Sequence, residues 1–546
     1  MKNWRINLVL ILIVLLSATI IGRLIYVQIL NGELFKAWAQ GQQNIPNITQ
    51  GERGEIFFKD GQILATNINE KYAYISPREI EKKEETAKSL SQTLNLIEDS
   101  VLEKVKKDNL FEVLKYKITD EEKTALEALN LPGVYVGEEI FRNYPQNTLA
   151  SQVVGFMGGA GEGQYGIEGY YNDILNAQEK TKNSSSSNET SKGSDIILTL
   201  DYNIQSMAEK LLKDASENLE FKSGQIVVIN PNSGEIIALA NFPAFNPNEY
   251  SEVKDMNIFQ NVVIQKIFEP GSIFKPITMA GALEEGKITP QTTYVDYGKL
   301  KIGGYTIYNY GNRVWGEQTM TGVLEKSINT GAVFAEEQLG NKKFLDYLDK
   351  FKVFEKTNID LQGEIFSENN SFKEGYAINF ATAAFGQGIE MTPIQIVRAF
   401  SAIANGGKLV KPYIVKEIST DSGKIETQPE VSDSIISSKT ASQLTSMLIS
   451  VVESGYGKAA KIPGYYIAGK TGTAQISWSA LDINKSGYSD ETWQSFIGYA
   501  PAFDPKFLIL VKLDNPQAKT AEYSAVPIFH DLAKYIINLW QIPPDH

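Results

Sequence analysis

The chain has 546 residues, 42% of them hydrophobic and 21% charged, so it predicts a globular protein of several domains. Its formal net charge of −13 disfavours general binding to nucleic acid, which requires an excess of Lys and Arg. It has no cysteine and only two histidines, His530 and His546, which excludes disulfides and thiolate catalysis and disfavours Ser-His-Asp triads and His-rich zinc sites.

The N-terminus carries an apolar run from Leu8 to Ile21, preceded by Lys2 and Arg5. A run of this length, with positive charge ahead of it, favours a membrane span whose N-terminus is cytoplasmic. A cleaved signal peptide is one alternative, but no A-x-A-like site follows the run. A buried helix is the other, but an apolar run at the extreme N-terminus behind a charged residue rarely forms one. We therefore predict a cytoplasmic tail over residues 1–7 and a single-pass transmembrane anchor in the cell membrane over residues 8–29, with the bulk of the protein extracytoplasmic.

Residues 30–194 contain no nucleophile and base at a suggestive spacing, which favours a structural or interaction module. Within them, residues 79–129 are rich in Glu, Lys, Leu and Ala with helical apolar spacing, and this predicts surface helices. The Ser/Asn/Lys-rich stretch 181–195 has no apolar residue and indicates a flexible loop or linker. We place the domain boundary at its end, although Gly224 is the latest position that the composition permits.

Residues 195–546 combine strand and helix signals. The predicted strands are 225–230, 235–240, 465–476, 494–500 and 506–513. The predicted helices are 272–283, 394–404 and 526–540. Strands at both ends of this segment with helices between them predict an α+β domain, in which an antiparallel sheet is flanked by helices.

Three short motifs of this segment carry chemistry, and in chain order they are Ser272-x-x-Lys275, Ser327-x-Asn329 and Lys470-Thr471-Gly472. Ser272 and Lys275 are three residues apart at a predicted helix start, so the amine can reach the hydroxyl. The helix N-terminus also favours negative charge developing at the serine. Lys275 acts as a base only when neutral, and burial beside a second cation such as Lys470 lowers its pKa in that direction.

The motifs differ in how specific they are. Taken singly, the first two occur by chance in a chain of this length, and a solvated helix start is the ordinary alternative for Ser272. Lys470 is a stronger signal, because it lies in an apolar predicted strand where an unpaired amine is costly. The ordered set predicts a serine acyl-transfer site that uses no histidine, no metal and no cofactor.

The motif set resembles that of the penicillin-binding protein and serine β-lactamase superfamily, and further strings make the chain similar to class B penicillin-binding proteins. These strings are Phe268–Ser272, Phe385–Ile389, Ala404–Gly407, Ser495–Pro501 and, in the N-terminal part, Arg53-Gly54 and 142–171. The resemblance covers nearly the whole chain after the predicted anchor. It implies a pedestal or dimerisation-type module over 30–194 and a transpeptidase domain over 195–546.

The resemblance also implies roles for single residues. Ser272 attacks the carbonyl between the last two D-alanines of a peptidoglycan stem peptide, and Lys275 takes its proton. Ser327 and Lys470 relay a proton to the leaving D-alanine, and Asn329 holds the amide of the acyl chain.

Substrate binding is implied for the rest of the third motif. Lys470, Thr471 and Thr473 face the terminal carboxylate, with Gly472 between them. The oxyanion lies between the backbone N–H groups of Ser272 and Thr473. A second stem amine then takes the acyl group and forms the crosslink.

Several rivals share these motifs. A β-lactamase adds fast deacylation but normally has neither an anchor nor a pedestal, and a β-lactam sensor requires further machinery on the cytoplasmic side. Within class B, the strings favour a division or sporulation role over an elongation role. The implied partners are peptidoglycan stem peptides, β-lactams, the membrane, a polytopic glycan polymerase and divisome proteins.

Overall fold

The structure is a computed structural model of the chain, and it describes residues 15–17, 52–159, 161–176, 192–420 and 423–546. The predicted anchor over residues 8–29 lies outside this part, except for three helical residues at 15–17. None of the helices in the described ranges is both long enough and apolar enough to cross a bilayer. Most of the predicted linker 181–195 also lies outside the described residues.

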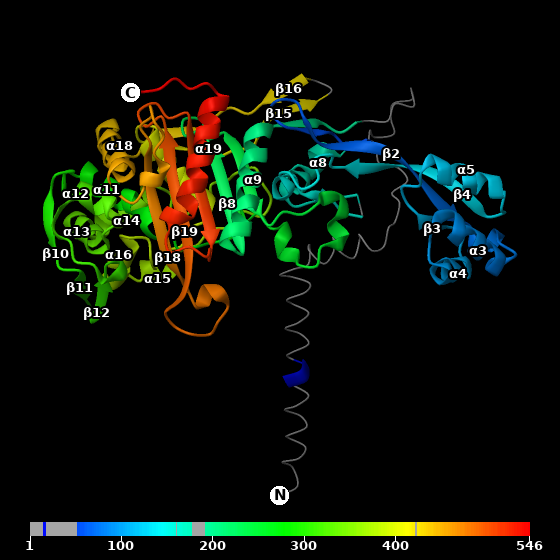
Figure 1. Ribbon diagram of the computed structural model, residues 1–546, viewed down its shortest axis with the longest axis horizontal. Coiled ribbons are helices and arrows are strands. Elements are labelled where there is room, and N and C mark those ends of the chain that lie inside the picture. Colours follow the sequence, from blue (N-terminus) through cyan, green and yellow to red (C-terminus); the bar gives the residue numbers. More distant parts are fainter. Residues whose placement is uncertain (1–14, 18–51, 160, 177–191, 421–422) are drawn as a thin grey trace, which may run out of the picture.

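The N-terminal part forms a pedestal that extends to one side of the C-terminal domain (Figure 1). The long strand β2 (Ile63–Ile75) pairs antiparallel with β4 (Val134–Asn143) and with β3 (Glu112–Lys115). The helices that pack on these strands are α3 (Lys83–Leu94), α4 (Glu98–Val105) and α5 (Asp120–Leu129). The helices predicted within 79–129 are therefore confirmed, with the short strand β3 between the second and the third.

The root of the pedestal contains a buried ion cluster. The elements here are α6 (Ser151–Val154), β5 (Phe156–Met157), β6 (Gly163–Gln164), α7 (Gly166–Tyr170) and α8 (Asn172–Leu175). The Nε atoms of Arg53 and Arg142 each lie 2.7 Å from a carboxylate oxygen of Glu168, whose side chain is completely buried. Burial opposes ionisation of Glu168, but the two guanidinium groups outweigh it and hold the pKa of its carboxyl below the usual value.

One sheet contains strands from both sides of the predicted domain boundary. Its order is β16-β15-β7-β1-β2-β3, with β4 also paired to β2. The strands not yet given are β1 (Ile56–Phe57), β7 (Asp195–Leu198), β15 (Val415–Thr420) and β16 (Gly423–Glu426). Strand β7 is parallel to β1 and antiparallel to β15, so it joins the pedestal to the C-terminal segment. The boundary itself stays a prediction.

The C-terminal domain is built on a five-stranded sheet whose neighbouring strands are all antiparallel, as predicted. Its strands, in spatial order, are β18 (Ala468–Ser477), β19 (Tyr488–Ala500), β20 (Phe507–Asp514), β8 (Ser223–Ile229) and β9 (Ile236–Phe242). Strand β19 begins six residues before the predicted position 494. Because β18 is an edge strand, one side of its backbone is left open for another segment.

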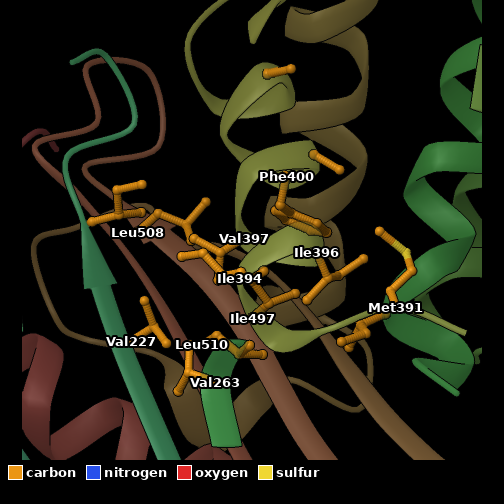
Figure 2. Close-up of a cluster of buried hydrophobic side chains, with 14 of the residues drawn as sticks. Val227, Val263, Met391, Ile394, Ile396, Val397, Phe400, Ile497, Leu508 and Leu510 are labelled. Carbon is orange, nitrogen blue, oxygen red and sulfur yellow. The ribbon is translucent and has the colours of Figure 1, made fainter. Parts of the chain in front are cut away.

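Helices cover both faces of this sheet, because alternate residues of each strand face opposite ways. On β8, Ile226 and Val228 pack against α9 (Tyr202–Leu219) and α19 (Ala525–Leu539). Figure 2 shows Val227 on the opposite face, where it lies in the cluster built around α17 (Pro393–Ala404). Two further helices, α11 (Lys275–Glu284) and α18 (Ser438–Glu453), pack on this second face.

The remaining elements form the walls and edges of the domain. The helices are α10 (Val262–Gln265), α12 (Met320–Glu325), α13 (Asn329–Leu339), α14 (Asn341–Lys350), α15 (Asn370–Lys373) and α16 (Ala377–Ala383). The strands form three pairs: β10 (Thr293–Asp296) with β13 (Gly316–Thr319), β11 (Lys299–Ile302) with β12 (Tyr305–Tyr308), and β14 (Lys408–Val410) with β17 (Val431–Ser434).

Candidate active site

Ser272 lies in a tight turn rather than in the α-helix predicted for 272–283. The turn is a 3-10 helix (Gly271–Phe274), and α11 begins only at Lys275. Gly271 has a φ of +57°, and a Cβ there would lie 2.7 Å from the Cβ of Ala474. The glycine therefore lets the nucleophile turn adopt a left-handed conformation and press directly on strand β18.

Lys275 joins the first two motifs. Its Nζ donates to Ser272 Oγ at 3.0 Å, to the backbone oxygen of Ser327 at 2.6 Å and to Asn329 Oδ1 at 2.9 Å, and it lies 3.2 Å from Ser327 Oγ. The side chain is completely buried. The amine is thus held within proton-transfer distance of two hydroxyl groups.

Ser327 links this lysine to the third motif. Lys470 Nζ donates to Ser327 Oγ at 2.9 Å, so the hydroxyl lies between two amines. Ser327 has a φ of +54°, a left-handed conformation that is uncommon for a residue with a Cβ. Backbone strain of this kind is typical of functional sites, and here it turns the hydroxyl toward both lysines.

The two lysines have strongly altered acidity. Burial, followed by the charge of Lys470, holds the pKa of Lys275 well below its ordinary value. Burial also lowers the pKa of Lys470, to about 7. Protonation of both amines in one buried site is costly, so the site favours the neutral, basic form of Lys275.

Strand β18 supplies the other predicted residues. Thr471 Oγ1 lies 3.4 Å from Lys470 Nζ, and Thr473 Oγ1 accepts from the backbone N–H of Ala521 at 3.2 Å. A Cβ on Gly472 would lie 2.5 Å from Ser495 Oγ. The glycine therefore keeps the strand close to its neighbour and to the nucleophile turn.

The site opens into a cleft of about 1130 Å³, lined by Ser272, Ser327, Asn329, Thr471 and Thr473. Lys275 and Lys470 lie behind these residues with no exposed surface. The structure thus brings together all of the residues that the three motifs predict.

The sequence reasoning missed the residues that hold the second motif in place. Asp296 is buried and accepts from Asn309 Nδ2 at 2.9 Å, from Trp315 N at 2.8 Å and from Thr330 Oγ1 at 2.7 Å. These bonds fasten the cleft wall to the start of α13, beside Asn329. No local pattern marks Asp296, because its partners lie far along the chain.

A second missed contact supports the nucleophile turn. The hydroxyl of Tyr488, at the start of β19, donates to the carboxylate of Glu269 at 3.0 Å. Burial raises the pKa of Glu269 to about 7. Glu269 comes three residues before Ser272, so this pair joins the turn to the sheet.

The geometry suits acyl transfer. A serine hydroxyl lies against a neutral lysine, and a second hydroxyl can pass a proton between two amines. Ser272 of the tight turn and Thr473 of the edge strand line the same cleft, and backbone N–H groups of such residues are common donors to an oxyanion. The described residues hold no cluster of His, Asp and Glu suited to a metal ion.

Comparison with known proteins agrees with this chemistry. The penicillin binding protein transpeptidase domain matches residues 224–534, and the penicillin-binding protein dimerisation domain matches residues 48–194. Stage V sporulation protein D of Bacillus subtilis is 34% identical over 537 residues, which cover 94% of this chain and 82% of that protein. Peptidoglycan D,D-transpeptidase FtsI of Buchnera aphidicola is 29% identical over 574 residues, which cover 100% of this chain and 96% of that protein.

The fold has counterparts among solved structures. Penicillin-binding protein 3 from Mycobacterium tuberculosis, crystallised with aztreonam, superposes with a TM-score of 0.71 at 25% identity, covering 91% of this chain and 98% of that one. The two matched modules together account for most of the sequence, and they occur in the order that the structure displays. The chain therefore belongs to the class B penicillin-binding proteins.

Proposed function

We propose that this protein is a serine D,D-transpeptidase that crosslinks peptidoglycan stem peptides through an acyl-enzyme on Ser272. One observation carries the proposal: Lys275 Nζ lies 3.0 Å from Ser272 Oγ, and Ser327 Oγ connects it to Lys470. This is a nucleophile, a base and a proton relay in one continuous network.

Acylation begins with transfer of the Ser272 hydroxyl proton to neutral Lys275 as Oγ attacks the D-alanyl-D-alanine carbonyl. The negative oxygen of the tetrahedral intermediate is stabilised by the backbone N–H groups of Ser272 and Thr473. The C–N bond then breaks, and Ser327 passes a proton from the lysine pair to the departing D-alanine. The acyl group remains on Ser272 as an ester.

Substrate orientation comes from both walls of the cleft. The hydroxyls of Thr471 and Thr473 face the terminal carboxylate of the donor stem, with the Lys470 amine behind them and Gly472 allowing the strand to approach. Asn329, whose Nδ2 donates to the backbone oxygen of Tyr308 at 3.0 Å, is held where it can bind the amide of the acyl chain. Held in this way, the carbonyl needs little reorganisation before attack.

Deacylation reverses the proton path. The amine of a second stem attacks the ester, its proton passes to the Ser327 relay, and Ser272 regains its hydrogen as the C–O bond breaks. A β-lactam acylates the same serine, but its leaving group stays attached to the acyl fragment. A durable penicilloyl-enzyme follows, in contrast to the short-lived one of a β-lactamase.

The setting of the reaction is a further part of the proposal. We infer an anchor over residues 8–29 with a cytoplasmic N-terminus, a pedestal over 30–194 and a catalytic domain over 195–546 outside the cytoplasm. The names of two relatives, a sporulation protein and FtsI, support septal wall synthesis over elongation. A polytopic glycan polymerase and divisome proteins are the expected partners.

The test is labelling with a fluorescent penicillin, with wild type and Ser272→Ala compared over about an hour. We expect a covalent label that persists in wild type and is absent from the folded variant. A label that forms and disappears within minutes would favour a β-lactamase, and folded wild type without label would contradict the catalytic role of Ser272.

A further inference from the structure

Two cations lie on one wall of the cleft, around Trp315. Lys326 Nζ is 5.1 Å from the centre of the Trp315 ring, and the guanidinium carbon of Arg313 is 5.8 Å from it. All three residues line the cleft that contains Ser272. The indole ring thus holds both positive groups at one place, through cation–π attraction.

Neither cation is neutralised by the protein. Lys326 Nζ donates to the amide oxygen of Gln318 at 2.6 Å, and Arg313 donates to the hydroxyl of Tyr456. Over the ranges that the structure describes, no carboxylate lies within ion-pair distance of either side chain. In a chain with a net charge of −13, two cations paired only with neutral groups in the reactive cleft require an explanation.

Arg313 and Lys326 lie at the end of the cleft where β18 begins, and this position indicates which substrate they face. Lys326 precedes Ser327, whose Oγ contacts Lys470 near the start of β18. Tyr456, the partner of Arg313, donates its backbone N–H to the oxygen of Glu325 at 3.2 Å. The pair therefore belongs to the Lys470 end of the cleft.

The opposite end of the cleft has a different charge. Gln475, toward the end of β18, pairs with Thr492 of β19, and the lining beside them includes Asp490. The segment after β20 adds one cation and one carboxylate to the lining, Lys519 and Glu522, and so no net charge. The cleft is thus positive at its Lys470 end and negative beyond Gln475, so the two ends favour ligands of opposite charge.

We propose that Arg313 and Lys326 form a subsite for a carboxylate of the acceptor stem peptide, separate from the terminal carboxylate held at Lys470. This inference rests on the proposed transpeptidation and adds the charge of the second substrate. The D-alanine released from the donor stem departs at the Lys470 end of the cleft. The amine of the acceptor then takes the place that this D-alanine occupied. A carboxylate borne by the acceptor, beyond its amine, then reaches the cations.

The reaction step is ordinary aminolysis. The neutral amine of the acceptor attacks the carbonyl carbon of the Ser272 ester and forms the new C–N bond. The C–O bond to Ser272 breaks, and the amine proton moves through Ser327 and the lysines to Ser272 Oγ. Arg313 and Lys326 contact the acceptor only, and they place its amine against the ester.

The experiment compares matched acceptors on one acyl-enzyme, formed from a synthetic N-acyl-D-alanyl thioester. The acceptors are D-2-aminoadipate and D-2-aminopimelate, each beside its ω-amide, which has the same shape and lacks the second charge. We expect the better diacid to give about tenfold more amide product than its ω-amide, because charge-assisted hydrogen bonds add roughly this factor. The preference should shrink with added salt, since exposed charges are screened.

Variants locate the effect. Arg313→Gln combined with Lys326→Met should bring the diacid-to-amide ratio close to one, whereas Arg313→Lys should keep part of the preference. Lys519→Met, which removes a different cation of the cleft lining, is the matched control and should keep the wild-type ratio. Each ratio is taken within one variant, so differences in the amount of folded enzyme cancel.

The outcomes separate this subsite from the proposed function. Equal use of diacid and amide by wild type, or a preference that survives the double substitution, would contradict the subsite. Consumption of the thioester reports on Ser272 alone. A donor that is never consumed would overturn the transpeptidation itself, and the inference with it, whereas a donor consumed without any preference for the diacid would overturn only the inference.

Discussion

At the scale of single residues, the site depends on two amines that the fold removes from water. Lys275 and Lys470 have no exposed surface, and Ser327 Oγ lies between them at 3.2 and 2.9 Å. Burial makes each ammonium costly, and the charge of one disfavours protonation of the other. The enzyme thereby obtains a neutral base without histidine.

This arrangement predicts the pH dependence of penicillin acylation. Only neutral Lys275 accepts the serine proton, so the rate constant should rise with pH up to its pKa and then stop rising. Because burial and the charge of Lys470 hold that pKa well below 10.5, the rise should end at a lower pH than it would for an ordinary lysine. In Lys470→Met the residual activity should show its rise at higher pH, because the charge that disfavours protonation of Lys275 is gone.

Labelling rates between pH 5 and pH 10 test this expectation. A rate constant that keeps climbing by about tenfold per pH unit to pH 10 would indicate an ordinary lysine and contradict it. A profile in Lys470→Met that stays at the wild-type position would contradict the coupling between the two amines.

The motif residues could be predicted from the sequence because each chemical role is limited to few residue types at fixed spacing. Ser272 and Lys275 need one helical turn between them, and Lys470 stands out in an apolar strand. Asp296 could not be predicted, since its hydrogen bonds with Asn309, Trp315 and Thr330 join segments that only the tertiary fold brings together.

At the scale of elements, the nucleophile turn is joined to the sheet through one buried acid. The Glu269 carboxylate accepts from the Tyr488 hydroxyl and from the backbone N–H of Gly388, while the charge of Glu390 opposes its ionisation. Tyr488 opens β19, which begins earlier than the sequence predicts. Residues 488–492 are polar apart from the Tyr488 ring, so no apolar alternation marks them as a strand.

The raised pKa of Glu269 predicts a pH-dependent stability. In the fold this pKa is about 7, above its ordinary value of 4.5, so the folded state binds the proton more tightly. Glu269 therefore lowers the free energy of unfolding as the pH rises from 4.5 to 7, by up to about 3 kcal/mol. Below pH 4.5 the carboxyl is protonated in both states, and nothing is lost. Glu269→Gln cannot ionise, so its free energy of unfolding, relative to wild type, should increase between pH 5 and pH 8.

Urea unfolding at the two pH values measures this difference. Tyr488→Phe is the matched comparison, because loss of the hydroxyl donor should raise the pKa of Glu269 further and steepen the fall of stability with pH. A difference between Glu269→Gln and wild type that does not change with pH would show that Glu269 titrates normally.

At the scale of the whole molecule, the pedestal root and the catalytic domain share one hydrophobic core. Phe156 and Ile167 of the root belong to the same buried cluster as Ile273, beside the nucleophile, and Leu510 of the central sheet. Strand β7 also connects the two parts, because it pairs with β1 of the pedestal and with β15 of the C-terminal segment. Sequence periodicity reports only local pattern, so neither the shared core nor this sheet could be predicted.

Continuity of the core predicts that damage at the root reaches the active site. Glu168→Gln keeps the shape of the side chain but leaves the guanidinium groups of Arg53 and Arg142 without their carboxylate. A buried ion pair that loses one partner costs about 3–5 kcal/mol. We expect the thermal midpoint of pedestal unfolding, followed by circular dichroism, and that of penicillin labelling to fall together.

The control for this substitution is Asp120→Asn, which removes the exposed ion pair of the pedestal with Lys71. Solvent already screens that pair, so neither midpoint should change measurably. If Glu168→Gln lowered the midpoint of the pedestal while penicillin labelling survived to the wild-type temperature, the two parts would unfold independently. The buried cluster that they share would then be a contact between separate folding units, whereas a joint fall of both midpoints is the behaviour of one cooperative core.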